Sequence, residues 1–145
     1  MSQDLHIQLI DPSAQTARAL FTFGTSPVGV EGVQKLANRW LKIFMTRKGS
    51  HPVRKDEGTD FPSLVGGNFS DLPALEADVL EAIDDATEQL RTSDRRAPTR
   101  PANERILSAS LVQFVELHPA GAEFWVELTN VARERLPVLI PYAPG

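Results

Sequence analysis

The chain of 145 residues contains no cysteine, which excludes disulfides, thiolate metal sites and a cysteine nucleophile. It also lacks an apolar run long enough to span a bilayer, and its first six residues lack the charged start and apolar run of a secretory signal. A basic surplus is missing as well, because the net charge is -4. We therefore expect a soluble protein, made in the cytoplasm, whose partners are neither membranes nor nucleic acids.

The composition that remains is ordinary for one globular domain. Hydrophobic residues make up 41% of the chain and charged residues 23%, and the length falls within the usual range of a single domain. We expect one domain over residues 1–145. Its parts are an extended N-terminal arm (1–28), a helical part (29–91), a basic connector (92–105) and a C-terminal sheet (106–145).

An amphipathic helix is predicted over residues 30–46. Apolar residues recur there at the three- and four-residue spacings of one helix face: Val30, Val33, Leu36, Ala37, Trp40, Leu41, Phe44 and Met45. The cations Arg47 and Lys48 favour the negative end of the helix dipole, and Gly49 is a typical stop. The polar stretch of residues 50–60 predicts an exposed loop.

A second helix is predicted after an N-cap at Ser70 or Asp71. Its buried stripe is Leu75, Val79, Ile83, Ala86 and Leu90. Residues 71–90 carry seven acids and no lysine or arginine, so the outer face is strongly negative. Residues 91–105 reverse the sign with five arginines and contain Pro98 and Pro101, which predicts an extended basic connector.

From Ile106 onward the apolar period is two, which predicts strands over residues 107–117 and 124–129 with a turn at residues 118–121. In the first of these strands Leu107, Ala109, Leu111, Val115 and Leu117 are expected on one face. A last strand over residues 138–142 is bracketed by Pro137 and Pro141, so it should lie at a sheet edge. Shorter extended segments are expected at residues 5–10 and 19–23. The predicted fold class is α+β, with two main helices packed on a small, mostly antiparallel C-terminal sheet that has an open edge strand.

Chemical motifs are weak. The histidines His6, His51 and His118 are isolated, without the spacing of a zinc site, and Lys48-Gly49-Ser50 ends a helix where a phosphate loop would open one. Glu81 and Asp85 share a helix face, and a small cell-wall glycosidase with its catalytic carboxylates among residues 76–88 is the enzymatic alternative. We expect a non-enzymatic protein, with no catalytic, cofactor-binding or metal-binding residues.

The order of several short motifs carries a resemblance to a known family. A helix is followed by Thr46, then Lys48-Gly49, then Gly58 and Asp60-Phe61, and the pair Glu104-Arg105 precedes the first long C-terminal strand. This order resembles the GPW-like phage baseplate wedge proteins, the sheath initiators of contractile tails. In that family a proline separates the corresponding glutamate and arginine, and here it is missing.

The resemblance implies a structural protein of the virion tail baseplate, assembled in the host cytoplasm in multiple copies around the tail axis. It implies the tail sheath protein, baseplate wedge proteins and tail tube or hub proteins as partners. The protein would start the sheath by strand addition to the first sheath ring. The equivalent component of a type VI secretion system or a tailocin is an alternative with the same mechanism.

The partner-binding residues expected from this hypothesis lie in three places: the first loop, the basic connector and the C-terminal edge strand. They are Lys48, Gly49, Asp60, Arg95, Arg96, Arg100, Glu104, Arg105, Val138, Leu139, Ile140 and Tyr142. An edge strand has unpaired backbone groups that can accept a strand from another chain. Deletion of residues 136–145 is expected to leave the helical part folded and to prevent sheath growth.

Overall fold

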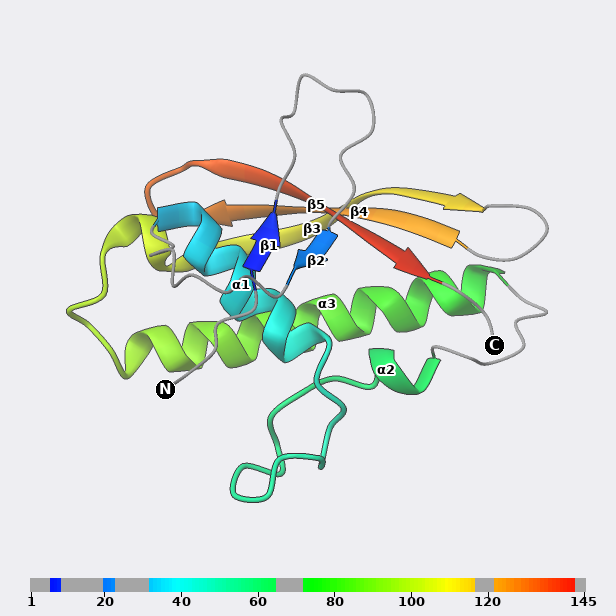
Figure 1. Ribbon diagram of the computed structural model, residues 1–145, viewed down its shortest axis with the longest axis horizontal. Helices are drawn as coiled ribbons and strands as arrows, with labels where there is room; N and C mark the ends of the chain where they lie inside the picture. Colours follow the sequence, from blue (N-terminus) through cyan, green and yellow to red (C-terminus); the bar gives the residue numbers. More distant parts are fainter. Residues whose placement is uncertain (1–5, 9–19, 23–31, 65–71, 117–121, 143–145) are drawn as a thin grey trace.

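The computed structural model of the protein describes residues 6–8, 20–22, 32–64, 72–116 and 122–142 (Figure 1). In chain order these residues form β1 (His6–Gln8), β2 (Leu20–Thr22), α1 (Gly32–Phe44), α2 (Phe61–Leu64), α3 (Leu72–Arg95), the 3-10 helix η1 (Ala102–Glu104), β3 (Ile106–Glu116), β4 (Ala122–Asn130) and β5 (Arg135–Tyr142). The predicted N-cap at Ser70 or Asp71 and the predicted turn at residues 118–121 lie outside the described residues.

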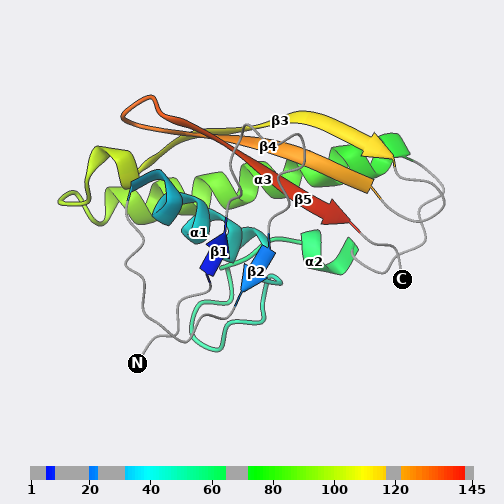
Figure 2. The ribbon, with the colours of Figure 1, turned by 45° about the horizontal axis from the view of Figure 1, so that its top comes forward.

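Two layers make up the body of the protein. Strands β3, β4 and β5 form an antiparallel sheet in that order, with β4 in the centre. The long helix α3 packs beneath β3, and α1 packs against α3 and beneath β4 and β5 (Figures 1 and 2). Strands β1 and β2 form a separate antiparallel pair. The α+β fold class is confirmed.

Helix α1 follows from its apolar stripe. Leu36, Ala37, Trp40, Leu41 and Phe44 of that stripe are all buried. Met45 was expected on the same stripe, but it follows the last residue of α1 and is 44% exposed. At its C-terminal end the helix is therefore two residues shorter than predicted, within the usual variation of helix boundaries, and Val30 lies outside the described residues.

Helix α3 is longer than predicted, and the extended connector is correspondingly shorter. The helix continues to Arg95, so residues 92–95 are helical, and residues 102–104 form η1. No glycine or proline interrupts the chain before Pro98, which disfavours helical geometry at the residue before it. The prediction of an extended segment from residue 91 to residue 105 was wrong because arginine, threonine and serine do not by themselves end a helix.

Strand β3 has two irregularities that the sequence pattern missed. The pairing register with β4 shifts between Ile106 and Ser108 and again between Leu111 and Gln113. An extra residue in a strand moves all following side chains to the opposite face. Phe114, rather than the predicted Val115, therefore packs against the core.

Strand β4 matches its prediction. Ala122, Phe124, Val126 and Leu128 are buried at alternate positions, and the residues between them are half-buried. Phe124 meets Phe44 and Phe61 edge to face, at ring-centroid distances of 6.2 Å and 5.6 Å. These contacts tie the centre of the sheet to α1 and to the start of α2. No helix in the described part of the chain is long and apolar enough to cross a bilayer.

Candidate interaction surfaces

Residues 46–49 and 58–61, which carry part of the resemblance, meet at the base of the loop between α1 and α2. The Thr59 N–H donates to the Thr46 carbonyl at 2.8 Å, and the Lys48 N–H donates to the Thr59 carbonyl at 3.1 Å. The Thr59 hydroxyl donates to the carbonyl of Phe44 at 2.7 Å. Residues 46–49 and 58–61 thus form a closed structure, called the loop base below, which joins the end of one helix to the start of the next.

Gly58 is required at the loop base for two reasons. Its φ of +114° lies in the region that favours glycine, and a Cβ there would overlap the carbonyl oxygen of Thr46. Its N–H and carbonyl also bond the side-chain amide of Gln89 on α3, at 2.9 Å and 2.7 Å. Gly49 has a φ of +82° with open space around it, so only its backbone conformation calls for glycine.

Beyond the loop base the chain projects from the helical layer on the side away from the sheet (Figures 1 and 2). The His51 Nδ1 accepts hydrogen bonds from the N–H groups of Val53 and Arg54 at 3.2 Å and 3.0 Å. Val53 is 84% exposed at this tip. His51 therefore has a local structural contact. The predicted exposure of this loop is confirmed for residues 50 and 52–56 but not for Gly58 and Thr59, which are buried.

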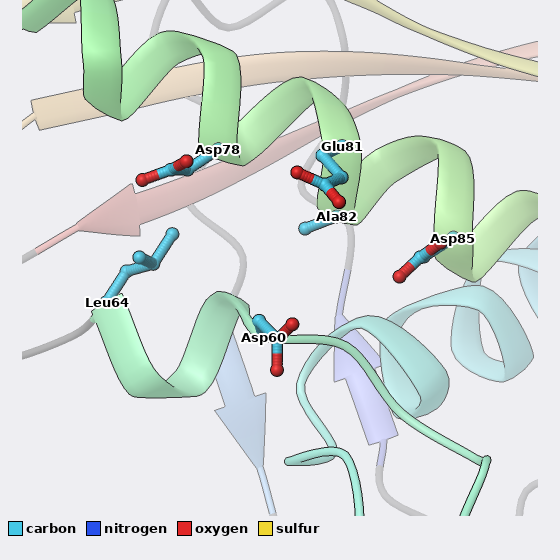
Figure 3. Close-up of a pocket in the computed structure, with 6 residues that line it drawn as sticks. All are labelled: Asp60, Leu64, Asp78, Glu81, Ala82 and Asp85. Atoms are coloured by element: carbon cyan, nitrogen blue, oxygen red, sulfur yellow. The ribbon is translucent and has the colours of Figure 1, made fainter.

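Of the candidate residues in this region, Lys48, Gly49 and Asp60 are exposed. The Lys48 ammonium lies 3.6 Å from the Asp85 carboxylate of α3. Asp60 lies at the start of α2 and faces α3 across a shallow hollow of about 150 Å³ (Figure 3). The structure thus places Lys48 and Asp60 beside the acidic face of α3.

The hollow is acidic but is not built like a catalytic cleft. Its lining consists of Asp60, Leu64, Asp78, Glu81, Ala82 and Asp85. A glycosidase holds one of its two carboxyl groups in apolar surroundings. Here Asp78 and Glu81 are exposed, and Asp85 faces Lys48. Within the described residues no cluster of three or more histidine, aspartate or glutamate side chains is arranged to hold a metal ion.

Part of the basic segment folds back onto a buried carboxylate. Asp94, 7% exposed at the end of α3, accepts hydrogen bonds from Arg39 Nη2 at 2.8 Å, from Arg100 Nη1, and from the Ile106 N–H at 2.9 Å. Arg39 also donates to the Glu104 carbonyl at 3.0 Å. These three side chains, the Glu104 carbonyl and the Ile106 N–H, called the Asp94 cluster below, join α1, α3, η1 and the start of β3.

The candidate residues of the basic segment therefore divide into two groups. Arg100 and the buried Glu104 are engaged inside the protein, since Glu104 also pairs with Lys35 at 3.0 Å. Arg105 is half-buried. Arg95 and Arg96 are exposed, and Arg95 lies 3.9 Å from Glu88. Within the basic segment, Arg95 and Arg96 are therefore the arginines that a partner can reach most directly.

The structural role of Asp94 was missed by the sequence reasoning, which treated it as one acid within a basic linker. The available signal was its position, because an aspartate near a helix C-terminus is unfavourable with the helix dipole unless cations offset it. The second signal was Arg39, a cation off the apolar stripe of the first helix. Neither signal shows that Arg39 binds Asp94 unless the packing of α1 against α3 is already known.

At the C-terminal edge, the side chains of Val138 and Ile140 belong to the core. Leu139, on the other face, is 8% exposed. The backbone of β5 extends to Tyr142 and pairs with β4 on one side only, as expected for an edge strand. The part of β5 that remains for a partner is thus its backbone rather than its apolar side chains.

Comparison of the chain with models of protein families, with curated proteins and with solved structures gave no match.

Proposed function

We propose that this protein is a structural component of a contractile-tail baseplate, where it starts the tail sheath by pairing the edge of its C-terminal sheet with a strand of the sheath protein. The observation that carries the proposal is the sheet itself. Among the described residues its three strands leave β3 and β5 each paired on one side only. The motif order that resembles the sheath initiators supports the biological setting.

Strand addition suits a protein that must begin a polymer. An unpaired edge supplies a row of backbone donors and acceptors, and alternate side chains of the incoming strand set its register. An open edge on an isolated protein favours aggregation, whereas in an assembly the partner covers it. The sheet is held rigid from below by α1 and α3, so little conformational entropy is lost when a partner strand binds.

The loop base with the loop tip, and the exposed Arg95 and Arg96 at the end of α3, are two further sites suited to protein contacts. Lys48, Gly49, Asp60, Arg95 and Arg96 are all exposed. In the proposed setting these residues contact baseplate wedge or tail tube proteins. The acidic face of α3 favours a basic partner surface, because complementary charges speed and orient association.

The carboxylates of α3 support the glycosidase alternative less well than the sheet edges support the baseplate proposal. Glu81 and Asp78 face solvent along a regular helix whose other side is buried, and this arrangement is typical of an outer helix surface. A peptidoglycan-clearing assay with the purified chain distinguishes the two classes. Clearing that depends on Glu81 would favour the hydrolase.

The direct test removes the protein from the contractile tail encoded with it. Tails made without it are expected to carry a baseplate and tube but no sheath, and added full-length protein should restore sheath growth. Copurification of the tagged protein with baseplate wedge proteins is the second expected result. Normal sheath on tails that lack the protein would refute the proposal. Neighbouring capsid and packaging genes would separate a phage from a secretion system or tailocin.

A further inference from the structure

The two edges of the C-terminal sheet differ in how well they can accept a strand. Residues 135, 137, 139 and 141 of β5 point their backbone groups to the same side, because these directions alternate along a strand. Proline is tolerated in a sheet where no N–H is needed to pair with the neighbouring strand. Pro137 and Pro141 therefore indicate that the backbone groups on this side of β5 point away from β4. The outer side of β5 therefore has N–H donors at Arg135 and Leu139 and none at the prolines.

The outer edge of β3 lacks this protection. Its eleven residues contain no proline, and residues 106–115 contain no charged side chain. Proline and inserted charges are the usual devices that keep an edge strand from pairing with another chain. At the start of β3 the Leu107 carbonyl accepts a hydrogen bond from Arg91 Nη2 at 2.7 Å, so the edge open to a partner lies beyond that residue.

The core beneath the two edges also differs. Beneath β5, Leu136 is partly buried, but Val138 and Ile140 are 0% and 3% exposed, so helices and neighbouring strands already cover them. Beneath β3, the core-facing residues Ala109, Leu111 and Phe114 pack against the core but are only partly buried. Apolar area left open beside an unpaired strand is what an added strand would cover, at about 25 cal/mol per Å² removed from water.

We propose that the edge of β3 from Ser108 to Glu116, and not the edge of β5, receives the partner strand. This inference rests on the proposed function for the identity of the partner, the sheath protein. The partner segment is extended and free of proline, with apolar residues at alternate positions that cover Leu111 and Phe114. The bulge at Val112, which is 62% exposed, bends this edge, so the incoming strand pairs on one side of it or carries a matching bulge.

The absence of cysteine gives a clean test, because a single introduced thiol is the only one in the chain. Ser110→Cys places it on β3, and the matched variant Arg135→Cys places it on β5. Both positions are exposed and both strands pair with β4 there. Each full-length variant is labelled with a benzophenone maleimide, incorporated into baseplates, mixed with sheath protein and irradiated.

The expected result is a cross-linked product with the sheath protein from Ser110→Cys and none from Arg135→Cys. A product from Arg135→Cys alone would overturn the choice of edge while leaving the proposed function in place. If labelled baseplates start a sheath but neither variant captures it, strand addition at this sheet is wrong. Failure of the wild-type protein to enter baseplates would instead refute the proposed function.

A second measurement reports on function at the same edge. Ser110→Lys adds a charge of the kind that protects edge strands, and it should reduce the fraction of baseplates that carry a sheath. Arg135→Ala is the control and should leave that fraction unchanged. Circular dichroism of both variants checks that the fold is intact. Equal sheath initiation by wild type and Ser110→Lys would contradict the assignment to β3.

Discussion

Removal of the buried carboxylate of Asp94 should cost a large share of the stability of the protein. Asp94→Ala leaves Arg39, Arg100 and the Ile106 N–H without their common acceptor. A hydrogen bond to a charged group contributes about 1.5–3 kcal/mol, which would give an upper sum of roughly 4.5–9 kcal/mol for three. Hydrogen-bond energies are not additive, so the true loss is smaller.

Solvent lowers this figure further. The side chains of Arg39 and Arg100 are 21% and 23% exposed, so water can replace part of what they lose. Water cannot replace the hydrogen bond that the Ile106 N–H loses, because Ile106 is only 5% exposed. We therefore expect a loss of about 3–5 kcal/mol, the range for removing one partner of a buried ion pair. A domain of this kind is stable by only about 5–15 kcal/mol in total.

Urea unfolding followed by tryptophan fluorescence, from the buried Trp40 and the half-buried Trp125, measures this loss. At a slope of about 2 kcal/mol per molar urea, the midpoint of Asp94→Ala should fall by roughly 1.5–2.5 M with an unchanged slope. Asp84→Ala, an exposed acid on the same helix, should change stability by no more than about 0.5 kcal/mol. Asp94→Asn keeps an acceptor oxygen and should fall between the two. A loss below about 1 kcal/mol for Asp94→Ala would show that the Asp94 cluster does not stabilise the fold.

Three further changes probe the loop base, the aromatic core and the C-terminal strand. Gly58→Ala should destabilise by about 1–3 kcal/mol in thermal unfolding and by more than Gly49→Ala, because only at position 58 does the new Cβ also meet backbone atoms; equal losses would contradict that reading. Phe61→Ala should cost about 3–5 kcal/mol by denaturant titration, while Val53→Ala at the exposed tip should cost almost nothing, and a mild effect at Phe61 would mean that the core re-forms without it. Deletion of residues 136–145 should unfold the whole domain by circular dichroism and not spare the helices, since it removes two core residues; a cooperatively folded truncation would refute this.

The last of these differs from the expectation formed from the sequence, in which deletion of the C-terminal strand would leave the helical part folded. The prolines did indicate an edge, and β5 is one. The sequence could not show that its alternate side chains complete the core above α1. Point variants that leave the core intact are therefore better tests of strand addition than a truncation.

Local patterns were sufficient for much of the fold. The stripe of α1, the alternation of β4 and the prolines of β5 each depend on chain geometry over a few residues, so they can be read without a partner element. The same holds for the glycine-marked loop, whose closing residues were recognised as motifs. Its internal bonds, such as that between Thr59 and Thr46, show how those residues close the loop.

What the amino-acid sequence by itself established is the α+β class, the acidic outer face of α3 and the lack of thiol chemistry. The rest depended on contacts between residues far apart in the chain. Arg39 and Asp94 are separated by 55 positions, and no periodic pattern links them. The bulge at Val112 likewise reverses which residues face the core only because β3 must stay paired with β4. Long-range packing decided that Arg39 and Arg100 bind the buried Asp94 while Arg95 and Arg96 stay exposed, since only folding brings Asp94 within bonding distance of its partners. The same packing left β3 as the more open edge of the sheet.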